Sequence, residues 1–197
     1  KSILALTATA GPMVVRDICN TLRIPYGGEN QLLSPEMPIE ASTLDDGVKV
    51  LNCNRDNIDV YSLVLQSNDE RRFLLHKILK EKKGASDKRS KKLPVEEGCL
   101  SKGSVIIYVW RQKDTEIVAE QLNGAGIRGG IVCYHGGMAS NDRSRAQSQF
   151  LRGKARICVA TVAFGLGINK ADIVGVIHLC LPPSPEHYLQ EIGRAGR

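Results

Sequence analysis

Short apolar runs alternate with segments of helical character through the second half of the chain. The apolar runs cover residues 105–109, 131–134, 156–160 and 174–179. Helical segments are expected at 113–123 and 140–151, and again from Pro185 onward with Ser184 as the cap. Strands that alternate with helices form βαβ units, in which helices cover both faces of a parallel sheet. The pattern therefore predicts an α/β fold with functional residues in the loops that follow the strands.

The first half of the chain is less regular. An apolar run at 2–6 predicts a buried strand, and Pro12 suits the first turn of a helix that reaches about Leu22. Residues 25–47, rich in Pro, Gly, Ser and Asn, predict a loop or a partly disordered insertion. Further strands are expected at 48–51 and 58–63.

Two helices are each expected to bury one face. The first should begin behind Asn68 as its cap and reach about residue 82, with Phe73 on the buried face. The second, at 113–123, should turn Ile117 inward together with Val118 and Leu122.

Composition excludes several classes of protein. The 197 residues suffice for one sizeable core, or for one domain and a piece of another. No apolar run approaches the roughly 18 residues of a membrane helix. Six cysteines lie far apart, without a Cys-x-x-Cys pair, so no zinc site is expected in this span. They are typical of reduced thiols inside a cell, which implies a nuclear location in a eukaryote and a cytoplasmic one otherwise.

The net charge of +6 is concentrated in one segment. Residues 80–92 hold seven basic and two acidic side chains, which account for +5 of that total. Such a run is usually a solvated loop, here expected at 80–103. A prediction of nucleic-acid binding must therefore depend on local motifs.

The last residues carry the clearest candidate chemistry. Arg194 and Arg197 lie three apart, which would put both on one side of a helix. Gly193 and Gly196 would each cost such a helix about 1 kcal/mol relative to Ala, which indicates close approach by another group. Arginine suits phosphate because its planar fork donates paired hydrogen bonds. Taken alone, the pair fits a surface helix with solvated arginines equally well.

Five segments that follow one another along the chain change the interpretation of this arginine pair. They lie at 6–10, 107–112, 134–137, 160–172 and 190–197, and they resemble motif III, motif IV, the Tyr-His-Ala-Gly step, motif V and motif VI of the RecQ family of helicases. The resemblance covers nearly the whole chain outside 25–47 and 80–103. It implies that residues 1–47 end a first RecA-like domain and that 48–197 form the second, cut within motif VI.

The resemblance implies an ATP-driven helicase that moves 3′ to 5′ on single-stranded or partly duplex DNA, with ATP and Mg²⁺ between two RecA-like domains. Arg194 and Arg197 would then reach the γ-phosphate as arginine fingers, with Gln190 beside them. Asn169 would lie near the ribose, where Gly167 permits close backbone approach.

Other residues would contact DNA. Thr161 would contact a DNA phosphate, and His135 should lie on the same rim of the sheet because both follow strands. Trp110 would either stack on a base or cover the sheet edge. Arg111 stands one place earlier than the arginine of motif IV, where Gln112 is found instead. The residues expected to couple ATP state to DNA are Thr7 and Thr9.

The chain lacks a Gly-x-x-x-x-Gly-Lys-[Ser/Thr] loop and an Asp-Glu-x-His box. The resemblance assigns both, and most of the Mg²⁺ contacts, to a preceding domain, so this span alone is expected to have negligible ATPase activity. Two alternatives remain: a non-catalytic DNA-binding module, and an RNA helicase of the same superfamily.

A first prediction concerns the basic loop. If it contacts DNA, replacing its cations with Gln should make binding less sensitive to salt, because fewer counterions are released. The salt dependence of DNA affinity, followed by fluorescence anisotropy, checks this, and an unchanged slope would mean that the loop is only a linker. The residues to replace are Lys82, Lys83, Lys88, Arg89, Lys91 and Lys92.

Overall fold

The computed structural model describes residues 12–22, 55, 57–81, 96, 98–165 and 168–196. The chain divides into two compact units, residues 1–56 with 184–190, and residues 57–183 with 191–197. Several predictions fall outside the described residues: the strands at 2–6 and 48–51, the insertion at 25–47 and the centre of the basic loop. Thr7, Thr9, Gly167 and Arg197 also lie outside them.

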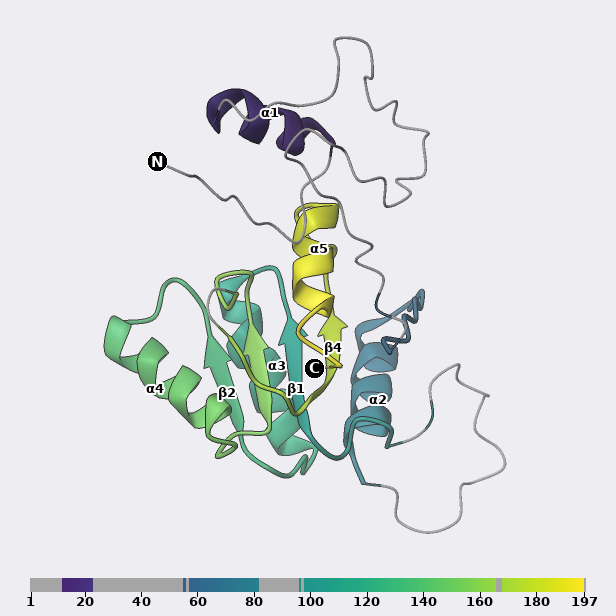
Figure 1. Ribbon diagram of the computed structural model, residues 1–197. Coiled ribbons are helices and arrows are strands. Elements are labelled where there is room, and N and C mark those ends of the chain that lie inside the picture. Colours follow the sequence, from purple (N-terminus) through teal and green to yellow (C-terminus); the bar gives the residue numbers. More distant parts are fainter. Residues whose placement is uncertain are drawn as a thin grey trace. The chain divides into compact units, whose positions relative to one another are not determined.

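A four-stranded parallel sheet forms the centre of the second unit (Figure 1). Its strands are β1 (Ser104–Tyr108), β2 (Ile131–Tyr134), β3 (Ile157–Ala160) and β4 (Ile173–His178), in the order β2-β3-β1-β4. All three strand pairs are parallel, and Tyr108, Tyr134, Ala160 and His178 share one level at the carboxyl ends. The predicted α/β architecture is confirmed.

Each face of the sheet is covered by its own helices. Helices α2 (Asn68–Leu79) and α3 (Gln112–Gly124) pack on one face, and α4 (Ser140–Leu151) packs on the other. Alternate residues of β1 serve the two layers: Val105 and Ile107 face α2 and α3, whereas Ile106 and Tyr108 lie on the side of α4. This double burial explains why β1 is a continuous apolar run.

The first unit contains helix α1 (Pro12–Leu22) and most of α5 (Pro185–Ile192). Both helices begin at the proline that the sequence predicts. The hydroxyl of Ser184 accepts a hydrogen bond from the backbone N–H of His187 at 3.3 Å, which confirms Ser184 as the cap of α5. Among the described residues, no helix has the length and apolar character needed to cross a membrane.

Two sequence predictions about α2 are wrong. Its cap is Ser67 rather than Asn68: Ser67 is extended, and its hydroxyl accepts from the backbone N–H of Glu70 at 3.1 Å. Phe73 is 62% exposed. The buried stripe contains Leu75, Ile78 and Leu79, and a residue two places before Leu75 lies on the opposite side of a helix.

The same helical geometry corrects Ile117, which is 48% exposed. The buried stripe of α3 runs through Thr115, Val118, Ala119 and Leu122, spaced three and four residues apart, so Ile117 lies beside it.

The predicted strand at 58–63 is also wrong, because this segment has no regular secondary structure. Val60 is 61% exposed and Tyr61 is 56% exposed. A local alternation of apolar and polar residues favours extended backbone, but a strand also needs a partner, and no described strand pairs with this segment.

Arg156 closes the amino end of the sheet. Its guanidinium donates hydrogen bonds to three backbone carbonyls, those of Leu79 at 3.1 Å, Leu100 at 2.7 Å and Arg128 at 3.0 Å. These carbonyls belong to the last residue of α2, the turn before β1 and the turn before β2. A cation at the end of α2 also complements the negative pole of that helix. One side chain thus joins three segments that are distant in sequence.

We therefore expect Arg156→Gln to lower the free energy of unfolding by about 2 kcal/mol, because buried acceptors lose a charged donor. Urea denaturation of this chain measures the effect. Arg152→Gln is the matched control. Arg152 is exposed at the end of α4, so its replacement should change stability little. Equal midpoints for the two variants would contradict the role assigned to Arg156.

Candidate functional site

The loops after β1, β2 and β3 meet along one rim of the sheet, defined here as residues 109–112, 135–137 and 161–165. The backbone N–H of Thr161 donates to the carbonyl of Tyr134 at 3.1 Å, which joins the loops after β2 and β3. A Cβ added to Gly136 would lie 4.0 Å from the Cβ of Ala163. The structure thus confirms that Thr161 and His135 share one rim.

Gln112 bridges two of these loops. A Cβ at Gly137 would clash with the side-chain amide of Gln112, so the loop after β2 approaches the start of α3 closely there. Arg111 is exposed, and its backbone N–H donates to the carboxylate of Asp114 at 3.4 Å. The arginine side chain therefore extends toward solvent at the rim, while the glutamine fills the space between loops.

Other rim residues differ in accessibility. Trp110 is 63% exposed and follows β1, which is an inner strand, so the interpretation of Trp110 as a cover for the sheet edge is not supported. Thr161 is only 7% exposed. The Nδ1 atom of the half-buried His135 is buried without a hydrogen-bond partner among the described residues. A buried donor or acceptor left unpaired is costly, and functional sites are one place where this cost is tolerated.

Arg194 is buried, with 4% of its surface exposed. Its guanidinium lies against Gly165, where an added Cβ would be 3.3 Å from Nη2. Its Nε atom is buried without a hydrogen-bond partner in the described part of the chain. The structure therefore brings Arg194 of the last segment against the loop that begins at Thr161.

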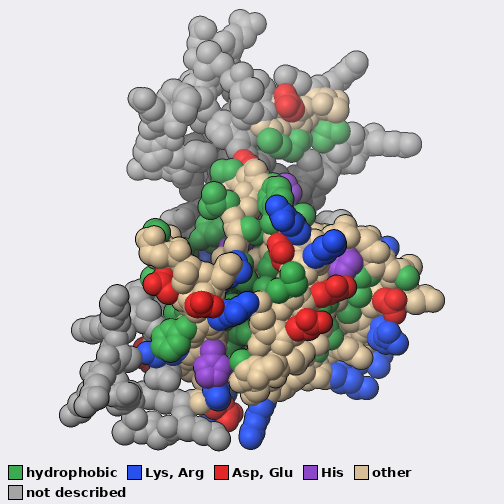
Figure 2. Space-filling model, turned by 180° about the vertical axis from the view of Figure 1, so that it is seen from behind, with side chains coloured by type: hydrophobic (Ala, Val, Ile, Leu, Met, Phe, Trp, Pro, Cys, Tyr) green, Lys and Arg blue, Asp and Glu red, His purple; other side chains and the backbone are tan. Residues whose placement is uncertain are grey.

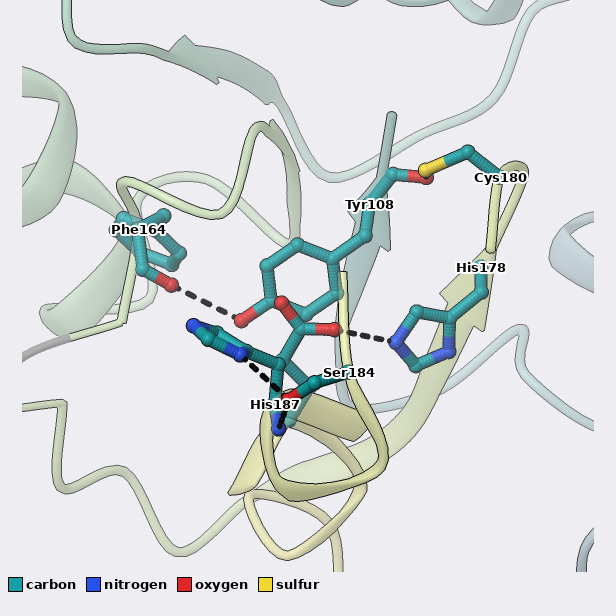
Figure 3. Close-up of polar contacts among 7 residues, drawn as sticks. Tyr108, Phe164, His178, Cys180, Ser184 and His187 are labelled. Atoms are coloured by element: carbon teal, nitrogen blue, oxygen red, sulfur yellow. Dashed lines mark hydrogen bonds and ion pairs between the residues drawn. The ribbon is translucent and has the colours of Figure 1, made fainter. Parts of the chain in front are cut away.

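Tyr108 lies between Phe164, in the loop that begins at Thr161, and His178 of β4 (Figure 3). Its hydroxyl donates to the carbonyl of Phe164 at 2.9 Å, and its ring stacks on His178 with centroids 5.4 Å apart. Burial raises the pKa of Tyr108 well above its usual value, although the nearby guanidinium of Arg194 acts in the opposite direction. The hydroxyl therefore stays protonated at neutral pH and can donate its hydrogen bond to Phe164.

His178 is hydrogen-bonded to Glu191, with 2.7 Å between Nε2 and Oε2. The two side chains are 14% and 5% exposed. His178 is thus a largely buried polar link between β4 and the start of the last segment.

Arg194 does not lie in a helix, which corrects the sequence prediction that one helix carries both arginines. Helix α5 ends at Ile192, and the residues that follow form a turn. Gly196 has a φ of +66°, and its N–H donates to the carbonyl of Ile173 at 3.3 Å. The side-chain amide of Asn57 donates to the carbonyl of Gly196. Gly196 is therefore required by backbone conformation and close contact with Asn57.

The remaining predicted residues are dispersed. Gln190 and Asn169 are exposed, the first on α5 and the second in the loop before β4. No group of three His, Cys, Asp or Glu side chains able to hold a metal ion occurs among the residues that the structure describes. Sequence reasoning missed Tyr108, Asn57 and Glu191, whose partners lie far away in the sequence or were assigned to other roles.

Comparisons with known proteins identify the family to which the chain belongs. The profile of the family described as "Helicase conserved C-terminal domain" matches residues 91–197, more than half of the chain. The human ATP-dependent DNA helicase Q4 is 45% identical over 48% of this chain. The Arabidopsis thaliana ATP-dependent DNA helicase Q-like 5 is 35% identical over 99% of it, and the Haemophilus influenzae ATP-dependent DNA helicase RecQ is 45% identical over 48%.

The chain therefore belongs to the helicase conserved C-terminal domain family and is of the RecQ type within helicase superfamily 2. Its parallel sheet with flanking helices is an α/β fold. The chain spans 9%, 17% and 15% of the lengths of these three relatives.

Asp172, at the end of the motif V segment, has a local structural role. Its carboxylate pairs with the ammonium of Lys170 at 2.8 Å and accepts from the hydroxyl of Ser104 at 3.0 Å. Partial burial acts to raise the pKa of Asp172, but the hydrogen bonds from Lys170 and Ser104 outweigh it and hold that pKa below its usual value. The ionised form is thus favoured by folding.

A depressed carboxyl pKa contributes stability that is complete above the unfolded pKa and is lost as pH falls through the folded one. Asp172→Asn should therefore be less stable than wild type at pH 7, with the difference vanishing in acid. Urea denaturation across this range measures it. Ser104→Ala should remove part of the same pH-dependent difference, and a deficit that does not change with pH would contradict the assignment.

Proposed function

We propose that this chain forms the second motor domain of an ATP-dependent, RecQ-type DNA helicase. In this role it binds DNA along the rim and presents arginines to the γ-phosphate of ATP held by a preceding domain. The observation that carries the proposal is the packing of Arg194, in motif VI, against Gly165, in the loop that also holds Thr161. One small region thereby joins the motif assigned to ATP with the motif assigned to DNA.

The two arginines receive different tasks. Arg197 is assigned the direct contact with the γ-phosphate, because an arginine placed there stabilises the charge that spreads over the transferring group. Arg194 is 4% exposed, so it contacts phosphate only after its side chain turns outward. In the described conformation Arg194 packs against the loop at Gly165, and its unpaired Nε is one donor that such a movement would satisfy.

ATP with Mg²⁺ supplies the phosphoryl group and the metal charge that such a site uses. The contacts to Mg²⁺ are assigned mainly to the preceding domain. On this chain, Asn169 and Gln190 are exposed and can reach a nucleotide without rearrangement of the core, and both keep the roles assigned by their motifs, toward the ribose and beside the arginines.

The rim is assigned to the DNA strand. Thr161 offers a hydroxyl for phosphate, Trp110 offers an exposed ring on which a base can stack, and Arg111 offers a charged fork. His135 completes the set with its unpaired Nδ1. On the face seen in Figure 2, basic and acidic side chains are interspersed, which favours local contacts at the rim over attraction to one broad basic surface.

The named relatives are DNA helicases, and this is why DNA is proposed over RNA. Translocation from 3′ to 5′ belongs to the same proposal. An RNA substrate would be recognised by its 2′-hydroxyl. Unwinding assays with matched DNA and RNA duplexes, each with a 3′ or a 5′ tail, separate the substrate and the polarity.

The central test is ATP hydrolysis by the parent helicase with single-stranded DNA, comparing wild type with Arg197→Ala. Removing an arginine finger should lower turnover by about 10³–10⁵-fold while DNA affinity is retained. Arg197→Lys is the matched control and should restore little, because a lysine lacks the bidentate fork.

Unchanged turnover in Arg197→Ala would refute the arginine-finger assignment. Absence of turnover in the wild-type parent, with DNA binding intact, would instead favour a non-catalytic DNA-binding module.

A further inference from the structure

Tyr108 is not part of the surface proposed to bind DNA or ATP. It nevertheless contacts both the loop 161–165 and the turn that holds Arg194. It is 1% exposed, so its hydroxyl is not available to DNA or ATP. That hydroxyl donates to the carbonyl of Phe164 at 2.9 Å, inside the loop that begins at Thr161. The guanidinium of Arg194 lies near enough to act electrostatically on the same hydroxyl. A single phenol therefore joins the DNA-facing loop to the arginine-bearing turn.

The ring of Tyr108 also links the loop 161–165 to the turn that holds Arg194, through His178 and Glu191. The ring stacks on His178, its neighbour across β1 and β4, with 17° between the planes. His178 pairs with Glu191 at 2.7 Å, and the carbonyl of Glu191 accepts from the backbone N–H of Arg194 at 3.2 Å. Figure 3 shows the tyrosine ring beside His178, with its hydroxyl directed at Phe164. The ring and the hydroxyl of Tyr108 are thus both connected to the turn that holds Arg194.

The packing leaves this network little freedom. Gly165 lies so close to Arg194 that an added Cβ would be 3.3 Å from Nη2 and from the carbonyl oxygen of Val162. A movement of the loop therefore displaces the guanidinium directly, and it also moves the carbonyl that Tyr108 binds. Buried polar networks of this kind have few alternative arrangements, because an unpaired group in them is costly.

We infer that Tyr108 is a positioning residue that couples DNA binding at the loop 161–165 to the placement of the arginine-bearing turn. This inference rests on the proposed function. When DNA seats on Thr161, the loop carries the Phe164 carbonyl with it. Tyr108 and Arg194 follow, and the turn that holds Arg194 moves with them. Tyr108 therefore governs the stimulation of ATP hydrolysis by DNA, and not the chemistry itself.

The test is Tyr108→Phe in the full parent helicase, a change that removes only the hydroxyl. Five quantities are measured: the ATPase rate without DNA, the rate at saturating single-stranded DNA, the KM for ATP, the affinity for DNA and the melting temperature. We expect the stimulation by DNA to fall roughly tenfold, a typical magnitude for coupling between sites. The rate without DNA, the KM for ATP and the DNA affinity should stay within about twofold of wild type. Tyr61→Phe removes an exposed hydroxyl and should change none of these values.

Gly165→Ala tests the same link from the other side, because its methyl group would lie 3.3 Å from Nη2 of Arg194 and from the carbonyl oxygen of Val162, so the loop and the guanidinium must shift relative to each other. It should lower the stimulation measured at saturating DNA, whatever its effect on DNA affinity, and it keeps the inference testable if Tyr108→Phe folds poorly. Retention of full stimulation by both variants overturns the coupling role while the proposed function stands. Equal loss of both ATPase rates overturns it too, since this would mark a general structural defect. An inactive wild-type parent refutes the proposed function, and the inference with it.

Discussion

The pairing of β1 between β3 and β4 is the constraint on which the site depends. All of β1 is buried, and hydrogen bonds to strands on both sides fix its register. Because the strands are parallel, their carboxyl ends coincide, and the loops that follow are brought to one rim. The same register puts Tyr108 beside His178 and level with Ala160. Motif IV, motif V and the residues preceding motif VI thus meet because one strand is held in the centre.

The two ends of the sheet differ in how their polar groups are paired. At the amino end, Arg156 donates to three carbonyls and closes the turns around itself. At the carboxyl end, polar atoms of His135 and Arg194 remain buried and unpaired among the described residues. Satisfied groups stabilise a fold, whereas unpaired ones retain the capacity to bind something else. This asymmetry agrees with the assignment of function to the rim.

The candidate site was predictable to the extent that it consists of short motifs. Thr161 and His135 were placed on one rim because each follows a strand. The tyrosine network was not predictable, because Tyr108, His178 and Glu191 acquire their roles from contacts across strands and turns. The arginine pair shows the same limit: spacing suggested one helix, but α5 ends at Ile192 and the glycines serve a turn.

By itself, the sequence determined the parallel α/β fold, the bounds of its strands to within a residue or two, and the family. These properties follow from apolar periodicity and from the order of motifs, which are recorded along the chain. Only the tertiary structure decided which side chains are buried and which groups are paired. Phe73 and Ile117 are apolar yet exposed, and Arg194 is charged yet buried. Such outcomes depend on the neighbours that packing brings from distant parts of the chain, and no local pattern contains those neighbours.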